Sequence, residues 1–438
     1  MRLPKVSKYI VVGIDYGTRF TKVLFRDNGH VAGKACVVVS QAFPDGLFPS
    51  LLSLEGEIIK PYQTQGEVIA YLKMVAAYAV TAYDKEPSQA LETADIKIPD
   101  GLKKLRVIYQ DLDLAGLCLS YYFGCVLAET HRCIEEKLQP VKGDLVLYQL
   151  AVPTALTLQN KEMEKFFWIC LVNGRELFKK HGPHILDGLS LSQIYGTVEN
   201  DVLSNYDEIK KKYKHRCVTY PETAAAVAGF FFSKNSSDGI FITADVGAGT
   251  VDLNIFRRNR LNDQNQEPTL AYYSTQVAPL GAQMVSDEFK YVNPLAVDLL
   301  KEKLYKEIRK LIVQARRKQP NHGEVGDLRR TYDGARIFLF GGGKRNPVYR
   351  ETLLEGLDSQ LEKNFDYGGV NNPAVLDLPD YREIERPSPY VDSGRYAVAF
   401  GLTNNPLNLH KIILPDELSD ITREPPPDDQ RYGFDWND

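Results

Sequence analysis

The chain reads Asp245-Val246-Gly247-Ala248-Gly249-Thr250-Val251-Asp252 directly after an apolar run, 240–244, that is typical of a buried β-strand. A second stretch of the same kind, Gly13-Ile14-Asp15-Tyr16-Gly17-Thr18, ends the apolar run that begins at Tyr9. Each places a carboxylate at the end of a strand and then a glycine- and threonine-containing turn, whose backbone N–H groups can approach an anion closely. Two such turns facing each other would clamp a phosphate group.

A third turn, Gly341-Gly342-Gly343-Lys344-Arg345, follows the predicted strand 336–340. Its glycines would let the backbone approach a flat ring or a ribose, and the guanidinium of Arg345 could stack on adenine. Taken alone, this turn fits a helix entry and a ligand turn equally well. The first two turns taken singly would also fit ordinary β-turns, but their agreement with each other favours a nucleotide site.

The composition excludes several classes of function. The length of 438 residues predicts two or three domains, and 53 basic against 57 acidic residues give a net charge of −4, so we expect no nucleic-acid partner. The six cysteines form no C-x-x-C pair and are interpreted as reduced thiols of a cytoplasmic protein. The histidines show no zinc-binding spacing.

No stretch of the sequence predicts a membrane segment. The N-terminal apolar run is about five residues long, which is too short for a signal peptide. The most apolar longer stretch, 114–128, falls short of the roughly 20 residues that a membrane span requires. We therefore expect a cytoplasmic protein without a membrane partner.

Periodicity predicts alternating strands and helices. Residues 9–14 and 21–26 form a predicted hairpin, and an amphipathic pattern indicates a helix over 300–315. Further strands are expected at 37–40, 51–54, 145–153 and 240–244, and further helices at 112–137, from 163, from 222 and at 349–357. Residues 174–215, which are polar and carry a lysine cluster at 210–214, are interpreted as an insertion, and the tail 424–438 as disordered.

The expected chemistry is that of a magnesium–triphosphate site. Asp15 and Asp245 are the candidate metal ligands, because carboxylates at the strand ends can hold Mg²⁺ or its waters beside the phosphates. Glu222 follows Pro221 at the start of an alanine-rich helix and is the candidate for orienting or deprotonating the attacking water. The alternative interpretation of Glu222 is an acid favoured by the helix dipole. Phosphate donors are expected from Gly17, Thr18, Gly247, Gly249 and Thr250.

Together and in this order, the segments resemble the nucleotide-binding fold shared by actin, the sugar kinases and the DnaK-like heat-shock chaperones of the seventy-kilodalton class. Residues 13–18 resemble the first phosphate motif, 340–347 the adenosine motif and 397–401 the second connecting helix. The second phosphate motif at 245–252 is close to the chaperones' D-L-G-G-G-T-F-D, so the chaperone branch fits best. The resemblance covers roughly residues 8 to 402.

The resemblance implies an α/β, two-lobed actin-like ATPase fold, with a mixed β-sheet flanked by helices in each lobe and the nucleotide cleft between the lobes. Lobe I would span 1–238 and take back a helix at 403–420, while lobe II would span 239–400. The turn at 279–283 and Glu307-Ile308-Arg309-Lys310 resemble further nucleotide-binding motifs. The implied ligands of ATP are Gly17, Thr18, Arg19, Gly247, Ala248, Gly249, Thr250, Gly281, Glu307, Lys310, Gly341, Gly342, Gly343 and Arg345.

The chain departs from the chaperone pattern in four respects. The chaperones have glutamate before the proline that precedes the alanine-rich helix, whereas here Glu222 follows Pro221. The interval between Pro153 and Pro221 is longer than in the chaperones, and Lys60 and Lys73 are alternative candidates for the phosphate-contacting lysine. Too few residues follow Gly401 for a peptide-binding β-sandwich and lid, so we expect an ATPase core without a client-binding domain.

These features predict a slow Mg²⁺-dependent ATPase that acts as a DnaK-like switch on a protein partner. One alternative is an actin-like ATPase whose nucleotide cycle times filament assembly. A small-molecule kinase ranks last, because the sequence shows no signature of a second acceptor pocket. The sequence names neither the protein partner nor the oligomeric state.

Overall fold

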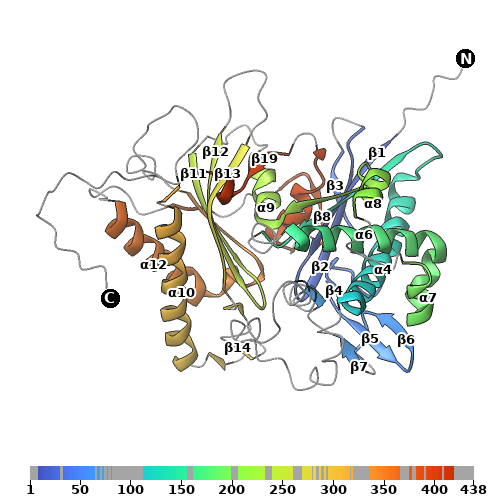
Figure 1. Ribbon diagram of the computed structural model, residues 1–438, viewed down its shortest axis with the longest axis horizontal. Coiled ribbons are helices and arrows are strands. Elements are labelled where there is room, and N and C mark those ends of the chain that lie inside the picture. The colour runs from blue at the N-terminus through green and yellow to red at the C-terminus, as the bar shows by residue number, and fades with distance from the viewer. Residues whose placement is uncertain are drawn as a thin grey trace, which may run out of the picture.

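The fold is mixed α/β, with two large sheets side by side and helices around them (Figure 1). The computed structural model describes residues 8–418 except 30–32, 65–66, 70–71, 74–75, 77–79, 81–111, 155–160, 199–205, 232–238, 260–268, 279, 283–285, 288–290, 293, 316, 319–335, 366–373, 377–380, 389–390 and 407–408. The predicted disordered tail, 424–438, lies outside the described residues.

The first large sheet contains the N-terminal hairpin. Its strand order is β10-β8-β1-β2-β3-β18, and β4 pairs with β2 beside this path. Strand β1 runs antiparallel to β2 and parallel to β8, which is itself parallel to β10. The strands are β1 (Tyr9–Tyr16), β2 (Phe20–Asp27), β3 (Ala35–Val37), β4 (Phe48–Pro49), β8 (Leu145–Val152), β10 (Cys217–Pro221) and β18 (Ile384–Glu385).

The second large sheet repeats this topology. Its order is β17-β16-β11-β12-β13-β19, with β11 antiparallel to β12 and parallel to β16. In each sheet, five strands therefore share one order and one set of directions: a three-stranded antiparallel meander followed by two parallel strands. The strands are β11 (Gly239–Val246), β12 (Val251–Asn259), β13 (Thr269–Ala278), β16 (Arg336–Phe340), β17 (Ala374–Leu376) and β19 (Lys411–Ile413).

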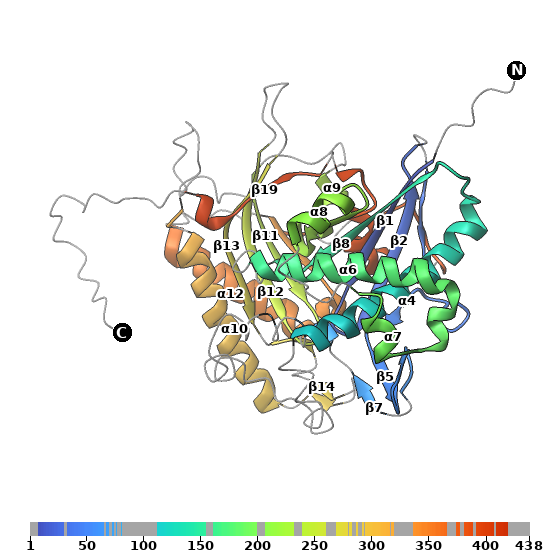
Figure 2. The same ribbon diagram turned by 45° about the vertical axis from the view of Figure 1, so that its right-hand side comes forward.

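Helices cover the outer face of each sheet and fill the space between the two sheets. Helices α4 (Leu112–Leu138) and α6 (Lys161–His181) pack on the first sheet, and α10 (Pro294–Ala315) and α12 (Pro347–Phe365) pack on the second (Figure 2). A third core, around α9 (Glu222–Phe231) and α13 (Ala397–Gly401), includes side chains of both sheets. None of the helices in the described ranges combines the length and apolarity needed to cross a bilayer.

Small residues let α9 and α13 pack closely between the sheets. A Cβ atom placed on Gly401 would lie 1.8 Å from the carbonyl oxygen of Ala225, so only glycine fits there. Both residues are buried. The alanine-rich helix predicted from residue 222 thus owes its composition to this close contact with α13.

A smaller four-stranded sheet lies beside the first large sheet, with the order β7-β5-β6-β9. Its strands are β5 (Leu52–Glu55), β6 (Ile58–Pro61), β7 (Glu67–Ile69) and β9 (Leu189–Ser190). The remaining short elements are β14 (Ser286–Asp287), β15 (Tyr291–Val292), α7 (Leu191–Tyr195), α8 (Tyr206–Tyr213), η2 (Gly182–Asp187), η4 (Gly342–Arg345), η5 (Ser393–Tyr396) and η7 (Pro415–Glu417).

Three predicted assignments need correction. The predicted insertion 174–215 begins inside the core helix α6, where Leu177 is fully buried, and it supplies β9 to the small sheet. The predicted helix at 403–420, expected to return to lobe I, is wrong, because β19 pairs in parallel with β13 of the second sheet. The first sheet instead receives β18, from within the range assigned to lobe II, because β18 pairs with β3.

Replacement of Gly401 by alanine is expected to lower the free energy of unfolding by about 2–3 kcal/mol, because the added methyl group overlaps the backbone of α9. Urea unfolding followed by circular dichroism measures this loss. Gly342→Ala is the matched control, since a Cβ on Gly342 meets nothing within 4 Å. Equal unfolding midpoints for the two variants would contradict the proposed close contact.

Candidate functional site

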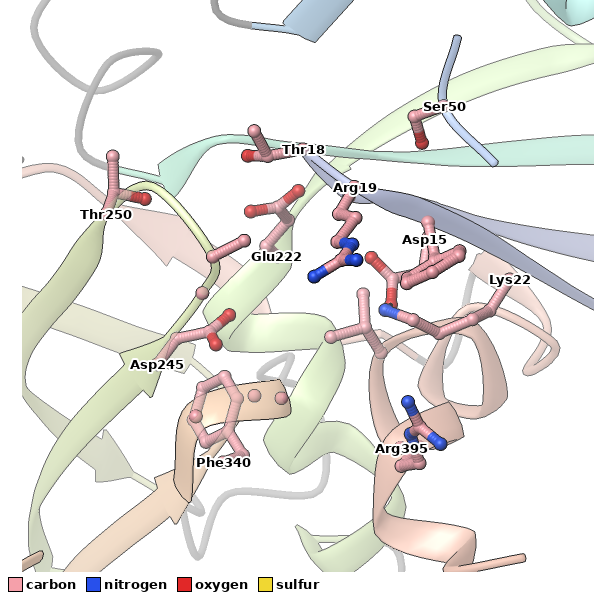
Figure 3. Close-up of a pocket in the computed structure, with 18 of the residues that line it drawn as sticks. Asp15, Thr18, Arg19, Lys22, Ser50, Glu222, Asp245, Thr250, Phe340 and Arg395 are labelled. Carbon is pink, nitrogen blue, oxygen red and sulfur yellow. Dashed lines mark hydrogen bonds and ion pairs between the residues drawn. The ribbon is translucent and has the colours of Figure 1, made fainter. Parts of the chain in front are cut away.

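A cavity of about 750 Å³ opens between the two large sheets and is lined by residues of both (Figure 3). Strands β1, β10, β11 and β16 end at this cavity, as expected for a ligand site at the carboxyl ends of parallel strands. Its lining includes Asp15, Gly17, Thr18, Arg19, Phe20, Lys22, Ser50, Leu51, Lys73, Glu222, Asp245, Gly247, Ala248, Thr250, Asp252, Ala282, Phe340, Gly341, Gly342, Gly343, Gly394, Arg395, Ala397 and Val398.

The hairpin of β1 and β2 carries a neutral pair of side chains at the cavity. Its register places Asp15 opposite Lys22. The two side chains form an ion pair, with 2.5 Å between Nζ of Lys22 and Oδ2 of Asp15. The charge of Asp15 is therefore balanced within its own hairpin.

The hairpin of β11 and β12 places two carboxylates opposite each other at the equivalent position. Its register pairs Asp245 with Asp252. Burial, with the charge of Asp252 next in importance, raises the pKa of Asp245 to about 8. Burial and the charge of Glu222 raise the pKa of Asp252 to about 7, although Lys73 and a hydrogen bond from Thr250 oppose this shift. Such a pair is costly to ionise, because like charges directly opposite each other in a sheet repel.

Glu222 is the first residue of α9 and is 5% exposed. Its carboxylate forms an ion pair with the ammonium of Lys73. Burial raises the pKa of Glu222 despite this partner. For Lys73, burial favours a lower pKa, but the charge of Glu222, its hydrogen bond with Lys73 and the charges of Asp15 and Asp252 together outweigh burial and raise the pKa. Of the two candidate lysines, Lys73 thus reaches the cavity, whereas Lys60 pairs with Glu55 at 2.7 Å and is not among the lining residues.

Three carboxylates of the cavity form a possible cation site. Oxygen atoms of Glu222, Asp245 and Asp252 all lie within 4.8 Å of one another. Asp15 is outside this group, so the structure joins only one of the two predicted metal ligands, Asp245, to the cluster. Oxygen ligands at this spacing suit a hard divalent cation.

The triple-glycine turn lies directly against Asp245. Gly341 has a φ of 87°, and a Cβ atom there would lie 2.2 Å from Oδ1 of Asp245. Only glycine therefore satisfies both the backbone conformation and the close approach. Gly342 faces open space, so this turn leaves room beside the carboxylate.

Most of the predicted ligand residues line the cavity, but some do not. Gly249, within the second turn, and Gly281 are not among the lining residues, and the N–H of Gly281 donates to the carbonyl oxygen of Gly249 at 3.1 Å. Glu307 and Lys310 pair with each other at 2.7 Å on α10 and are not among the lining residues. The backbone of Arg345 belongs to η4, and its side chain lies outside the described residues.

Several cavity residues were not singled out from the sequence. Lys22 follows Asp15 by seven positions, and Asp252 follows Asp245 by seven positions. The register of a hairpin closed by each turn would therefore have predicted that both residues lie opposite an aspartate. Ser50, Phe340 and Arg395 also line the cavity. No comparable local signal marks Arg395, which comes from η5 near the end of the chain.

The cavity contains both positively and negatively charged side chains that have no ion-pair partner among the described residues. Lys22 and Lys73 are paired with carboxylates, whereas Arg19 and Arg395 form no ion pair with any residue in the described part of the chain. Asp245 and Asp252 face each other and Glu222, and neither aspartate forms an ion pair with a lysine or arginine that the structure describes. The site can therefore accept a divalent cation and a polyanion together.

Comparison with protein-family models and with curated proteins finds no match to this chain.

The raised pKa values of Asp245 and Asp252 predict a pH-dependent stability. Between about pH 4 and pH 8 the folded state binds more protons than the unfolded state, so the free energy of unfolding falls as the pH rises. Asp245→Asn removes one of the opposed charges and should raise this free energy by on the order of 2 kcal/mol at pH 8, and by much less at pH 5.

Urea unfolding at both pH values, without divalent cations, measures the difference. Asp187→Asn is the control, because the Asp187 side chain is 79% exposed. A gain of the same size at pH 5 and pH 8 would show that charge repulsion is not its source.

Proposed function

We propose that this protein binds and hydrolyses Mg²⁺–ATP and acts as a DnaK-like conformational switch on a protein partner. The observation that carries this proposal is the charge pattern of one cavity: a cluster of three carboxylates beside two arginines without ion-pair partners among the described residues. A magnesium triphosphate complements both groups, since the metal matches the carboxylates and the phosphates match the guanidinium groups.

The repeated sheet topology supports an actin-like, two-lobed architecture. Both sheets combine a meander with two parallel strands in the same order. The first sheet contributes one glycine-rich turn to the cavity, and the second contributes two. The turns at 15–18 and 245–250 therefore approach one ligand from the two halves of the molecule, as the resemblance implies.

Asp245 and Asp252, with Glu222 beside them, would hold the magnesium ion or its waters. The carboxylate oxygens of these residues lie close enough together to hold one cation. A cation bound there would favour the ionised forms of the two aspartates, whose pKa values are raised in its absence. When bound, the metal neutralises phosphate charge and helps to orient the triphosphate. Asp15, which pairs with Lys22, would instead lie next to the phosphates as a neutralised pair.

Glu222 is placed to accept a proton from the attacking water. It projects from the start of α9 toward the cavity, and its raised pKa moves it closer to the range of an effective general base (Figure 3). As the water oxygen bonds to the terminal phosphorus, the bond to the bridging oxygen of ADP breaks and the water proton passes to Glu222. Lys73 would keep the carboxylate oriented through their ion pair.

The position of the cavity favours a conformational switch. Nucleotide contacts from both sheets would hold the two halves together, and hydrolysis would weaken those contacts. Helices α9 and α13 lie between the halves, so a change in closure would alter the packing of this helix pair. The six cysteines are free thiols, which supports a cytoplasmic location.

Filaments that form on addition of Mg²⁺–ATP, detected by light scattering and microscopy, would instead support the actin-like alternative.

Glu222→Gln should retain ATP binding and lose hydrolysis by about 10²–10⁴-fold, because the amide cannot accept the water proton. Phosphate release measures turnover, and isothermal titration calorimetry measures binding of Mg²⁺–ATP. Unchanged turnover with intact binding would assign the role of base to another group.

Gly342→Val should block nucleotide binding without disturbing the fold, because position 342 faces open space at the cavity. Binding at a ligand concentration of 100 Kd should stabilise the wild-type protein by about 2.7 kcal/mol. We expect the variant to melt like the wild type without nucleotide and to lose this gain. A preserved ATP-dependent shift would show that the triple-glycine turn does not contact the nucleotide.

A further inference from the structure

Arg19 lies in the first glycine-rich turn, and its side chain lines the cavity. It follows Thr18 between β1 and β2, and its carbonyl oxygen accepts a hydrogen bond of 2.9 Å from the backbone N–H of Ser50. Its guanidinium lies 5.5 Å from the ring centroid of Phe20. Figure 3 shows this group pointing into the cavity, between Asp15 and Glu222. The turn is thus anchored by its backbone while the charged end of the side chain stays accessible.

The charge of Arg19 is available to a ligand. Lys22 and Lys73 already pair with carboxylates, whereas Arg19 is exposed and forms no ion pair within the described residues. A planar guanidinium can donate two parallel hydrogen bonds to one phosphate group. A phosphate entering the cavity would therefore find in Arg19 a donor that needs to break no existing ion pair.

The surroundings of Arg19 and Arg395 indicate that the two side chains would contact different parts of a bound nucleotide. Arg19 extends from a phosphate-type turn toward Glu222, the candidate base. Arg395 belongs to η5, which lies next to η4 and its triple glycine, since a Cβ on Gly394 would lie 2.7 Å from Nζ of Lys344. Figure 3 shows Arg395 beyond Lys22, on the far side from Glu222. Arg19 is thus on the reacting side of the cavity and Arg395 on the side of the triple glycine.

We propose that Arg19 binds the terminal phosphate of ATP, so that it distinguishes ATP from ADP and stabilises the transition state of hydrolysis. This inference rests on the proposed function. During the reaction the water oxygen bonds to the terminal phosphorus, the bond to the bridging oxygen breaks, its electron pair leaves with ADP, and the water proton passes to Glu222. Arg19 donates N–H groups to the non-bridging oxygens of the transferred group, where charge accumulates in the transition state.

This assignment makes Arg19 selective for one nucleotide. ADP lacks the terminal phosphate, so the contribution of Arg19 to binding is lost after hydrolysis and phosphate release. Arg395, on the other side of the cavity, contributes equally to both nucleotides. The ratio of the affinities for ATP and ADP therefore depends on Arg19 and is independent of Arg395.

The experiment compares Arg19→Met with Arg395→Met as its matched control in the full-length protein. Calorimetry gives the Kd values of Mg²⁺–ATP and Mg²⁺–ADP, and phosphate release gives kcat. For Arg19→Met we expect an about 10–100-fold loss of ATP affinity, ADP affinity within about 2-fold of wild type, and a fall in kcat of at least about 100-fold. For Arg395→Met we expect an equal loss of affinity for the two nucleotides.

The outcomes separate this inference from the proposed function. If the wild type binds both nucleotides and Arg19→Met keeps the wild-type affinity ratio, the role of Arg19 is overturned and the proposed function stands. If the wild type binds neither nucleotide, both are overturned. Arg19→Lys serves as a second variant: it keeps the charge without the planar fork, so recovery of only part of the ATP preference supports bidentate binding. Melting of each variant without nucleotide confirms that it is folded.

Discussion

The facing carboxylates of Asp245 and Asp252 are the constraint around which the cavity is built. They face each other because β11 and β12 pair in a register that allows no other placement of these side chains at the end of the hairpin. Glu222 adds a third carboxylate from α9, and Gly341 removes the Cβ that would collide with Asp245. These three carboxylates repel one another when they are ionised, and a bound cation would reduce that repulsion.

The two halves repeat one topology but differ in charge at equivalent positions. In the first hairpin, Lys22 stands where the second hairpin has Asp252, and it neutralises Asp15. The Asp15–Lys22 pair is thus neutral, whereas Asp245 and Asp252 place two like charges opposite each other when both are ionised. This difference places the proposed metal on the second hairpin and leaves the first to contact phosphate through its turn and Arg19.

The chemistry of the cavity is linked to the packing between the halves through α9. Glu222 begins this helix, and Ala225, one turn later, contacts Gly401 of α13. A change in the position of Glu222 or of its partner Lys73 therefore acts on the helix pair that fills the space between the two sheets. In the proposed switch, this short path connects the state of the nucleotide with the closure of the cavity.

The sequence by itself determined the glycine-rich turns, the strands before them and the position of Glu222 at a helix start, because these depend on neighbouring residues and on local periodicity. Tertiary structure alone decided the pairing of Lys73 with Glu222, which are 149 positions apart, and the presence of Arg395 in the cavity. It also placed β19 in the second sheet, although a helix returning to lobe I was predicted at 403–420. Such contacts depend on how the sheets and helices pack against one another, and no local pattern of residues encodes that arrangement.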